Sequence, residues 1–169
     1  CLRVSNTLAA LPLIAAAFYG NPSKDLTIAA VTGSNGKTST TYLIESMWNQ
    51  AGLPCAVIGT IEYRWKNNTF KAPNTTPLSL DLQRMLAEIR KDGIRHVAME
   101  VSSHALKLHR VDGIRFRTAT FTNLSPEHLD FHKDMNDYRE AKSLLFTDYL
   151  ASDGTAVINT DDQHGRTIF

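Results

Sequence analysis

Short apolar runs alternate with amphipathic stretches along most of the chain. Runs rich in β-branched and apolar residues predict buried strands at 26–32, 55–58, 96–101, 118–122 and 155–159. Apolar residues at helical spacing predict helices at 8–19, 43–51, 78–89 and 138–145. Residues 61–65 alternate in polarity before a turn at 66–68, which indicates a hairpin. Strands that alternate with helices predict an α/β fold with a mostly parallel sheet and helices on both faces.

The first apolar segment, 8–19, predicts a helix that faces the core. It is too short to cross a bilayer, which takes about 20 residues, and Pro12 interrupts it. The turn cluster at 21–24 is the expected domain boundary, so that 1–25 and 26–169 belong to different domains. Because the chain opens on Cys1 and stops in mid-pattern at Phe169, we expect a piece of a longer protein.

The composition narrows the classes of function without selecting one. Of the 169 residues, 43% are hydrophobic and 21% are charged, which is typical of a soluble globular domain. The formal net charge of +1 gives no strong field for nucleic acid or an anionic membrane, and neither is expected as a partner. The two cysteines, Cys1 and Cys55, have no metal-binding or redox spacing.

The segment 33–39, Gly-Ser-Asn-Gly-Lys-Thr-Ser, lies where a predicted strand gives way to a predicted helix. Free N–H groups and the positive end of the helix dipole bind phosphate at such a junction. Lys37 adds a charge, and the Thr38 hydroxyl suits a magnesium ion. The longer phosphate-loop pattern would need a glycine in place of Val31, so the match is to a shorter variant. The alternative is a tight turn whose glycines only relieve strain.

Polar residues follow several predicted strands, as expected for a ligand site at the carboxyl edge of a parallel sheet. Glu100 ends an otherwise apolar strand, where a carboxylate is costly unless it is paired or binds metal. Beside a phosphate loop it suits magnesium, and a salt bridge to an arginine or lysine is the alternative. The polar residues at 102–104 and 123–125 also follow strands.

Three further patterns each have an ordinary interpretation. His128 and His132 have the spacing of one helical face, but Leu129 stands where a zinc protease has glutamate, and exposed histidines are common. Asn-Thr-Thr-Pro at 74–77 is typical of a helix cap. Ser-Ser-His at 102–104 suggests a nucleophile, although no Gly-x-Ser-x-Gly elbow surrounds it.

Taken together, these segments resemble the Mur ligases, and the resemblance covers nearly the whole chain. It rests on Thr-Gly-Ser-Asn-Gly-Lys-Thr at 32–38, Asn-Thr-Thr-Pro at 74–77, Met-Glu-Val-Ser-Ser-His-Ala-Leu at 99–106, Arg-Val at 110–111, Phe-Thr-Asn-Leu-Ser at 121–125, His-Leu-Asp at 128–130 and the region 138–146. Phe-Tyr-Gly-Asn-Pro-Ser at 18–23 is similar to the family's junction between its first and central domains.

The resemblance implies that 1–25 is the end of an N-terminal UDP-sugar domain and that 26–169 is the N-terminal part of a central P-loop-type ATPase domain, incomplete here. A C-terminal domain that binds the incoming amino acid is then absent. The implied activity is ATP-dependent addition of the third amino acid, lysine or meso-diaminopimelate, to UDP-MurNAc-L-Ala-D-Glu through an acyl phosphate. The implied location is the bacterial cytoplasm, and the partners are the UDP-MurNAc-dipeptide and a free amino acid.

The resemblance also implies roles for particular residues. ATP phosphates would be held by Gly33, Ser34, Asn35, Gly36, Lys37, Thr38 and Ser39. Thr38 and Glu100 would bind one Mg²⁺, and His128 with Lys142, modified to a carbamate, would bind a second. The precursor would be held by Asn74, Thr75, Thr76, Ser102 and Arg110, while Leu108 replaces a glutamine of some relatives.

Two other functions fit the same residues less well. One is a related ligase with another acceptor, such as a folylpolyglutamate or cyanophycin synthetase, in which the segments at 74–77 and 102–104 would differ. The other is a P-loop kinase or a nucleotide-binding module without catalytic activity. A kinase would be expected to carry the longer glycine loop.

Overall fold

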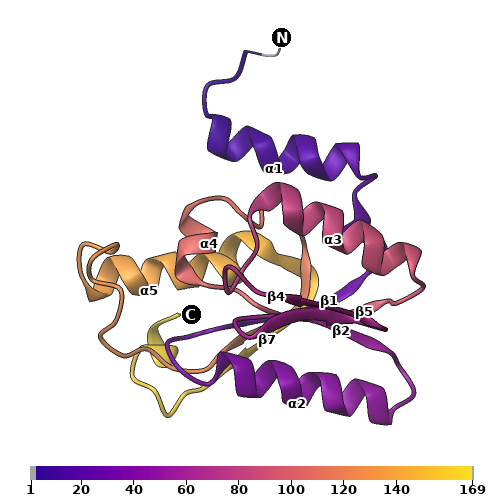
Figure 1. Ribbon diagram of the computed structural model, residues 1–169. Coiled ribbons are helices and arrows are strands. Elements are labelled where there is room, and N and C mark those ends of the chain that lie inside the picture. Colours follow the sequence, from indigo (N-terminus) through magenta and orange to yellow (C-terminus); the bar gives the residue numbers. More distant parts are fainter. Residues whose placement is uncertain (1–2, 169) are drawn as a thin grey trace.

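A computed structural model of the chain describes residues 3–168, so Cys1 and Phe169 lie outside the described part (Figure 1). Its sheet has the strand order β4-β3-β2-β5-β1-β6-β7. The strands are β1 (Thr27–Thr32), β2 (Cys55–Ile58), β3 (Glu62–Trp65), β4 (Asn68–Lys71), β5 (His96–Glu100), β6 (Phe116–Phe121) and β7 (Leu150–Ile158). The pairs β2–β5, β5–β1, β1–β6 and β6–β7 are parallel, and β3 and β4 add an antiparallel hairpin. The predicted α/β fold with a mostly parallel sheet is confirmed.

Helices cover both faces of this sheet, as the alternating pattern predicts. They are α1 (Thr7–Phe18), α2 (Lys37–Gln50), α3 (Ser79–Lys91), α4 (Ser103–Lys107) and α5 (Met135–Leu144), with a π-helical turn at Leu145–Tyr149 and 3₁₀ turns at Pro22–Asp25 and Gly165–Thr167. Helix α2 lies on one face and α3 on the other, and α1 packs on the outer side of α3 (Figure 1). Within residues 3–168 no helix is long and apolar enough to cross a membrane.

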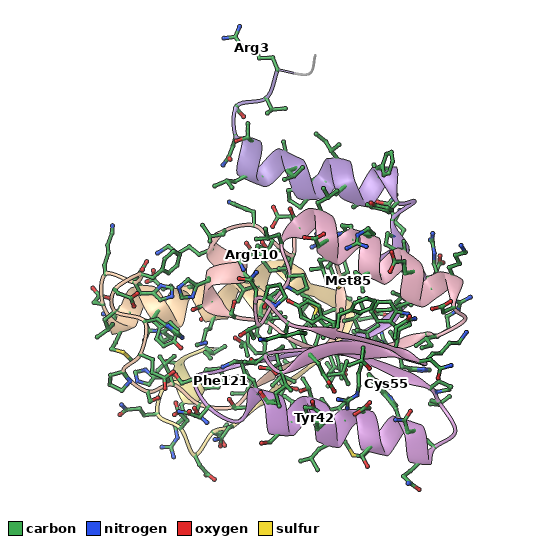
Figure 2. The ribbon with its side chains drawn as sticks, in the orientation of Figure 1. Arg3, Tyr42, Cys55, Met85, Arg110 and Phe121 are labelled. Atoms are coloured by element: carbon green, nitrogen blue, oxygen red, sulfur yellow. The ribbon has the colours of Figure 1, made fainter. Side chains whose placement is uncertain are left out.

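The core lies between the sheet and these helices (Figure 2). The side chains of Ile28, Ala30 and Val31 in β1 are fully buried, because β1 is central and covered on both faces. The parallel register pairs Val31 with Glu100 and Thr32 with Phe121. The carboxyl ends of β1, β5 and β6 therefore meet at one edge of the sheet, where the phosphate-loop segment begins.

The expectation that the first helix faces the core is wrong for most of its apolar residues. Only Pro12, Ala15 and Ala16 of α1 are buried. The exposed apolar side chains of this helix are Leu8, Leu11, Leu13, Ile14 and Phe18. Helix α1 touches the rest of the fold mainly through α3, and small side chains are what this close contact accommodates. Helix α2 departs from the prediction in the same way, since Leu43 and Met47 are exposed.

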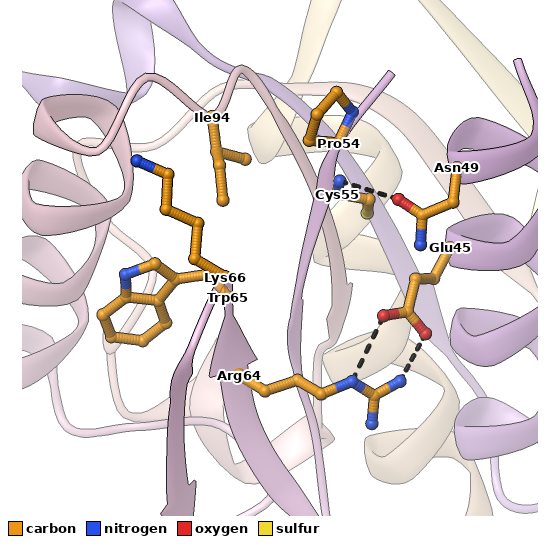
Figure 3. Close-up of a pocket in the computed structure, with 8 residues that line it drawn as sticks. All are labelled: Glu45, Asn49, Pro54, Cys55, Arg64, Trp65, Lys66 and Ile94. Atoms are coloured by element: carbon orange, nitrogen blue, oxygen red, sulfur yellow. Dashed lines mark hydrogen bonds and ion pairs between the residues drawn. The ribbon is translucent and has the colours of Figure 1, made fainter. Parts of the chain in front are cut away.

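Contacts of a charged side chain connect the hairpin β3–β4 to α2. The guanidinium of Arg64 on β3 pairs with the Glu45 carboxylate on α2 (Figure 3). The same guanidinium lies over the Tyr42 ring at 4.4 Å. Asn49 accepts a hydrogen bond of 3.3 Å from the backbone N–H of Cys55, the first residue of β2. The cavity of about 260 Å³ beside these residues therefore lies at the amino end of β2, away from the carboxyl edge of the sheet.

Candidate active site

The phosphate-loop segment takes a backbone shape that only glycine adopts freely. Gly33 has a φ of +143° and Gly36 a φ of +84°. A Cβ at position 33 would overlap the Thr122 hydroxyl, and it would lie 3.0 Å from the Asn123 carbonyl oxygen. Helix α2 starts at Lys37, directly after this turn, so its first N–H groups face the loop. The predicted strand–turn–helix junction is confirmed.

The loop is held from one side by the segment that follows β6. The Asn35 backbone N–H donates to Asn123 Oδ1 at 3.0 Å, and the Thr122 hydroxyl donates to the Asn35 carbonyl at 2.7 Å. The Ser34 hydroxyl oxygen accepts from the Ser125 N–H at 2.9 Å. These contacts fix the loop before any ligand arrives, which reduces the ordering cost of binding an anion. Their partners lie about 90 residues away, so sequence spacing did not reveal them.

Two lysine side chains converge on this loop. Lys37 Nζ donates to the carbonyl oxygens of Gly33 at 2.9 Å and Ser34 at 2.7 Å. Lys142 Nζ donates to the same Gly33 carbonyl at 2.9 Å and lies 4.5 Å from the centre of the Tyr138 ring. Burial, and to a smaller extent the neighbouring Lys37, lower the pKa of Lys142 to about 7. Burial also lowers the pKa of Lys37, an effect that Glu100 partly offsets.

Glu100 is buried, and hydroxyl and amide groups satisfy its carboxylate. Oε1 accepts from Thr38 Oγ1 at 2.8 Å and from the Thr60 N–H at 3.0 Å, while Oε2 accepts from Thr60 Oγ1 at 2.9 Å. Within the described residues it forms no ion pair, so the salt-bridge interpretation is wrong. A side chain at Gly59 would overlap this carboxylate. The Thr38 hydroxyl and the Glu100 carboxylate together form an oxygen donor set that suits Mg²⁺.

The segment 74–77 does not cap the following helix. The N-cap position of α3 is Leu78, which supplies no side-chain hydrogen bond. Thr76 is instead fully buried, and its hydroxyl donates to the Glu100 carbonyl at 2.9 Å and accepts from the Ser102 N–H at 3.0 Å. Arg110 donates to the Thr76 carbonyl at 3.2 Å. Thr76 therefore holds the Ser102 backbone and the Arg110 side chain in place through hydrogen bonds.

A cavity of about 280 Å³ brings together six of the predicted site residues. It is lined by Lys37, Asn74, Thr75, Ser102, His104, Arg110 and His128. Lys37 of the phosphate loop thus faces the residues predicted to hold the precursor. Thr76, Glu100 and Lys142 are buried beside this cavity rather than lining it. Ser39 lies on the exposed side of the first turn of α2.

His104 also lines the cavity, although the sequence singled it out only as part of the Ser-Ser-His segment. Its ring stacks on Phe131 at 4.0 Å and meets the His128 ring edge-on at 5.0 Å. Burial lowers the pKa of His104, and His128 and His132 lower it further, so the imidazole is uncharged at neutral pH. Its place directly after Ser102 and Ser103 was the one available signal.

His128 and His132 have the spacing of one helical face, but the two residues do not lie on a helix. His128 has a left-handed φ of +57° and lies in a turn before α5. His132 is buried, with Nε2 2.9 Å from the Ser103 hydroxyl and Nδ1 3.2 Å from the Asp137 carboxylate. Among residues 3–168 no group of three or more histidine, cysteine or acidic side chains is placed to hold a metal. A magnesium ion here would take its remaining ligands from phosphate oxygens and water.

Comparison with known proteins decides the family. A family model described as "Mur ligase middle domain" matches residues 31–169, which is most of the chain. The chain belongs to the Mur ligase family. The resemblance inferred from the motifs is therefore confirmed, and the matched residues include β2 to β7 with the helices between them.

Relatives named as ligases match nearly the whole chain. It is 51% identical to the UDP-N-acetylmuramoyl-L-alanyl-D-glutamate–2,6-diaminopimelate ligase of Geobacter metallireducens, over 99% of the chain and 34% of that relative. A solved structure of a ligase with this name is 36% identical over 90% of the chain and 30% of its own, with a TM-score of 0.77. The chain therefore spans about a third of the length of these relatives. The folylpolyglutamate synthetase of L. casei, described as an apo form, shares the fold with a TM-score of 0.65 at 14% identity over 84% of the chain and 42% of its own.

Proposed function

We propose that the chain is the nucleotide-binding part of a ligase that uses ATP to add 2,6-diaminopimelate to UDP-MurNAc-L-Ala-D-Glu. The observation that carries this proposal is the single cavity in which Lys37 faces Asn74, Thr75, Ser102 and Arg110. The names of the relatives favour diaminopimelate over lysine. With ATP as co-substrate, we also infer a cytoplasmic location. No nucleic acid and no membrane is proposed as a partner.

The phosphate loop, from Gly33 to Ser39, binds the ATP phosphates in this proposal. Its backbone N–H groups and Lys37 Nζ neutralise the β- and γ-phosphates, since Lys37 already reaches over the loop. The Thr38 hydroxyl and the Glu100 carboxylate, 2.8 Å apart, hold one Mg²⁺. When bound, the metal ion neutralises charge on the phosphates.

The precursor enters the same cavity with its terminal carboxylate toward Lys37. Arg110 and Ser102, which Thr76 fixes, bind the carboxylate region, and Asn74 and Thr75 bind the rest. A carboxylate oxygen attacks the γ-phosphorus and ADP leaves. The amine of diaminopimelate then attacks the acyl carbon, and inorganic phosphate leaves with the bridging oxygen. The chain contributes mainly position and positive charge to the phosphoryl transfer.

The second metal site is proposed from His128 and Lys142. Lys142 is buried, and its lowered pKa of about 7 makes an uncharged amine available for reaction with CO₂. The resulting carbamate is an oxygen ligand that magnesium accepts, whereas an ammonium group would repel the ion. His128 lines the same cavity as Lys37 and supplies a nitrogen ligand.

Oxygen transfer tests the proposed reaction in the full-length ligase from which we infer the chain to come. The precursor is labelled with ¹⁸O in its terminal carboxylate and incubated with MgATP and diaminopimelate. Because the bridging oxygen leaves with phosphate, one labelled oxygen per turnover is expected in inorganic phosphate by mass spectrometry. Unlabelled phosphate contradicts the acyl phosphate, and turnover of a folate substrate instead of the precursor supports the folylpolyglutamate alternative.

The 169-residue chain alone is expected to make no ligated product. It spans about a third of the relatives' length, and an acyl phosphate needs an enclosed site that excludes water. The measurement is liquid chromatography with mass spectrometry of reactions that contain the purified chain, both substrates and MgATP. The full-length ligase at the same concentration is the control, and tripeptide formation by the chain alone would refute the expectation.

A further inference from the structure

A row of polar side chains, buried at Ser103 and His132 and partly exposed at Asp137 and Lys107, joins α4 to α5 next to the cavity. The Ser103 hydroxyl on α4 lies 2.9 Å from His132 Nε2, and His132 Nδ1 lies 3.2 Å from Asp137 Oδ2 on α5. Lys107, at the end of α4, forms an ion pair with the same carboxylate. The Lys133 N–H also donates to Asp137 Oδ2 at 3.2 Å. The contacts therefore run from α4 through the 126–134 turn to α5 and back.

The hydrogen-bond partners fix the direction of each bond. A carboxylate only accepts, so His132 Nδ1 carries the proton and donates to Asp137. Nε2 of the uncharged ring is then an acceptor, and the Ser103 hydroxyl donates to it. This order, serine to histidine to aspartate, is the one that activates a serine nucleophile in hydrolases. Ser103 is only 1% exposed, however, and His132 is equally buried, so no substrate reaches the hydroxyl.

The two ends of this row of polar side chains adjoin the two halves of the proposed site. Ser103 lies between Ser102 and His104, which both line the cavity. Asp137 precedes Tyr138, whose hydroxyl lies 3.2 Å from the Ser34 hydroxyl of the phosphate loop. The Tyr138 ring also packs against His132, at 4.8 Å between ring centres. The row of polar side chains thus extends from the residues proposed to bind the precursor to those proposed to bind the nucleotide.

We propose that Ser103, His132, Asp137 and Lys107 form a positioning brace that sets the distance between the precursor-binding and nucleotide-binding halves of the cavity. The inference rests on the proposed ligase function, because it concerns the alignment of the two substrates. None of the four residues touches a substrate. The brace acts through Ser102 and His104 on one side and through Tyr138 on the other.

Ser103→Ala removes the hydroxyl from one end of the brace, and His132→Phe removes both of its central hydrogen bonds. In the full-length ligase we expect each variant to raise the KM for the precursor and to lower kcat, with a combined loss of about tenfold to a hundredfold in kcat/KM. The ATP affinity is expected to stay within about twofold, because the loop contacts from 122–125 remain. Steady-state kinetics and calorimetry with a non-hydrolysable ATP analogue measure the two quantities.

Asp92→Ala is the matched control. It removes a partly buried hydrogen bond of 2.9 Å from the Trp65 indole, at the end of α3, and none of the cavity residues touches it. The control is expected to lower thermal stability and leave both kinetic constants unchanged. If Ser103→Ala and His132→Phe behave like Asp92→Ala, the brace is structural only and the proposal is overturned. If the unmodified ligase makes no product, the proposed function fails and the positioning role fails with it.

Two measurements on the unmutated 169-residue chain keep the proposal testable if a variant does not fold. Long-range ¹H–¹⁵N NMR spectra are expected to show His132 as the Nδ1–H tautomer, and an Nε2–H tautomer would contradict the bond directions. A fluorophosphonate probe, which labels activated serines, is expected to leave Ser103 unmodified. Labelling of Ser103 would show that it is an accessible nucleophile and would overturn the brace.

Discussion

Lys37→Ala is expected to weaken MgATP binding by about tenfold to a hundredfold in the full-length ligase. The ammonium group lies within 2.9 Å of two carbonyl oxygens of the phosphate loop, so it is already positioned over the place where phosphate would bind. A charge-assisted hydrogen bond to phosphate contributes about 1.5–3 kcal/mol, which corresponds to this loss in affinity. Isothermal titration calorimetry with MgATP measures the change.

The Lys37 prediction has a control on the same domain. Lys91→Ala removes an exposed lysine at the end of α3, which is outside the cavity, and is expected to leave nucleotide affinity unchanged. Thermal unfolding of both variants separates a loss of binding from a loss of folding. Equal MgATP affinity in Lys37→Ala and the unmodified ligase would remove Lys37 from the phosphate site.

Much of the fold could be predicted because its signals are local. The strand, glycine turn and helix around Gly33 lie within about 25 consecutive residues, and each step has its own chemistry. The rule that ligands bind at the carboxyl ends of parallel strands then located Glu100 and Ser102 at the same edge. The register between β1 and β5 places Glu100 opposite Val31, as this reasoning requires.

The remaining features depend on partners that are distant in sequence. Thr76 forms its hydrogen bonds with Glu100 and Ser102, 24 and 26 residues away, and its spacing before Pro77 indicated only a helix cap. His132 and Ser103 are 29 residues apart, and neither spacing nor composition connects them. The helical spacing of His128 and His132 does not reflect a helix, because His128 has a left-handed φ.

The sequence also did not show which apolar helix faces are covered by other elements. Helical periodicity shows that Leu43 and Met47 share a face of α2, but not whether another element covers that face. In the described residues both side chains are exposed, and the fully buried residue of α2 is Thr41. The Thr41 hydroxyl can be buried because it donates to the Lys37 and Thr38 carbonyls, so its hydrogen bonds are satisfied within its own helix.

Lys142→Ala is expected to remove nearly all ligase activity, and a small carboxylate such as acetate is expected to restore part of it. This expectation follows from the proposal that Lys142 acts as a carbamate, an oxygen ligand, and not as a cation. Its side chain is 1% exposed and has a pKa of about 7, so a large fraction is uncharged at neutral pH and able to react with CO₂. Steady-state ligation with and without acetate at high concentration measures the loss and the rescue.

The pH dependence of the unmodified ligase gives an independent test of the Lys142 carbamate. Because burial lowers the pKa of Lys142 from 10.5 to about 7, the amine is uncharged above pH 7 and protonated below it. The carbamate and the activity that depends on it are therefore expected to disappear as the pH falls through about 7. A ¹³C NMR carbamate signal from ¹³CO₂ should follow the same curve and be absent from Lys142→Ala. Lys91→Ala, an exposed lysine, is expected to keep both signal and activity. Full activity of Lys142→Ala without acetate would show that Lys142 has no such role.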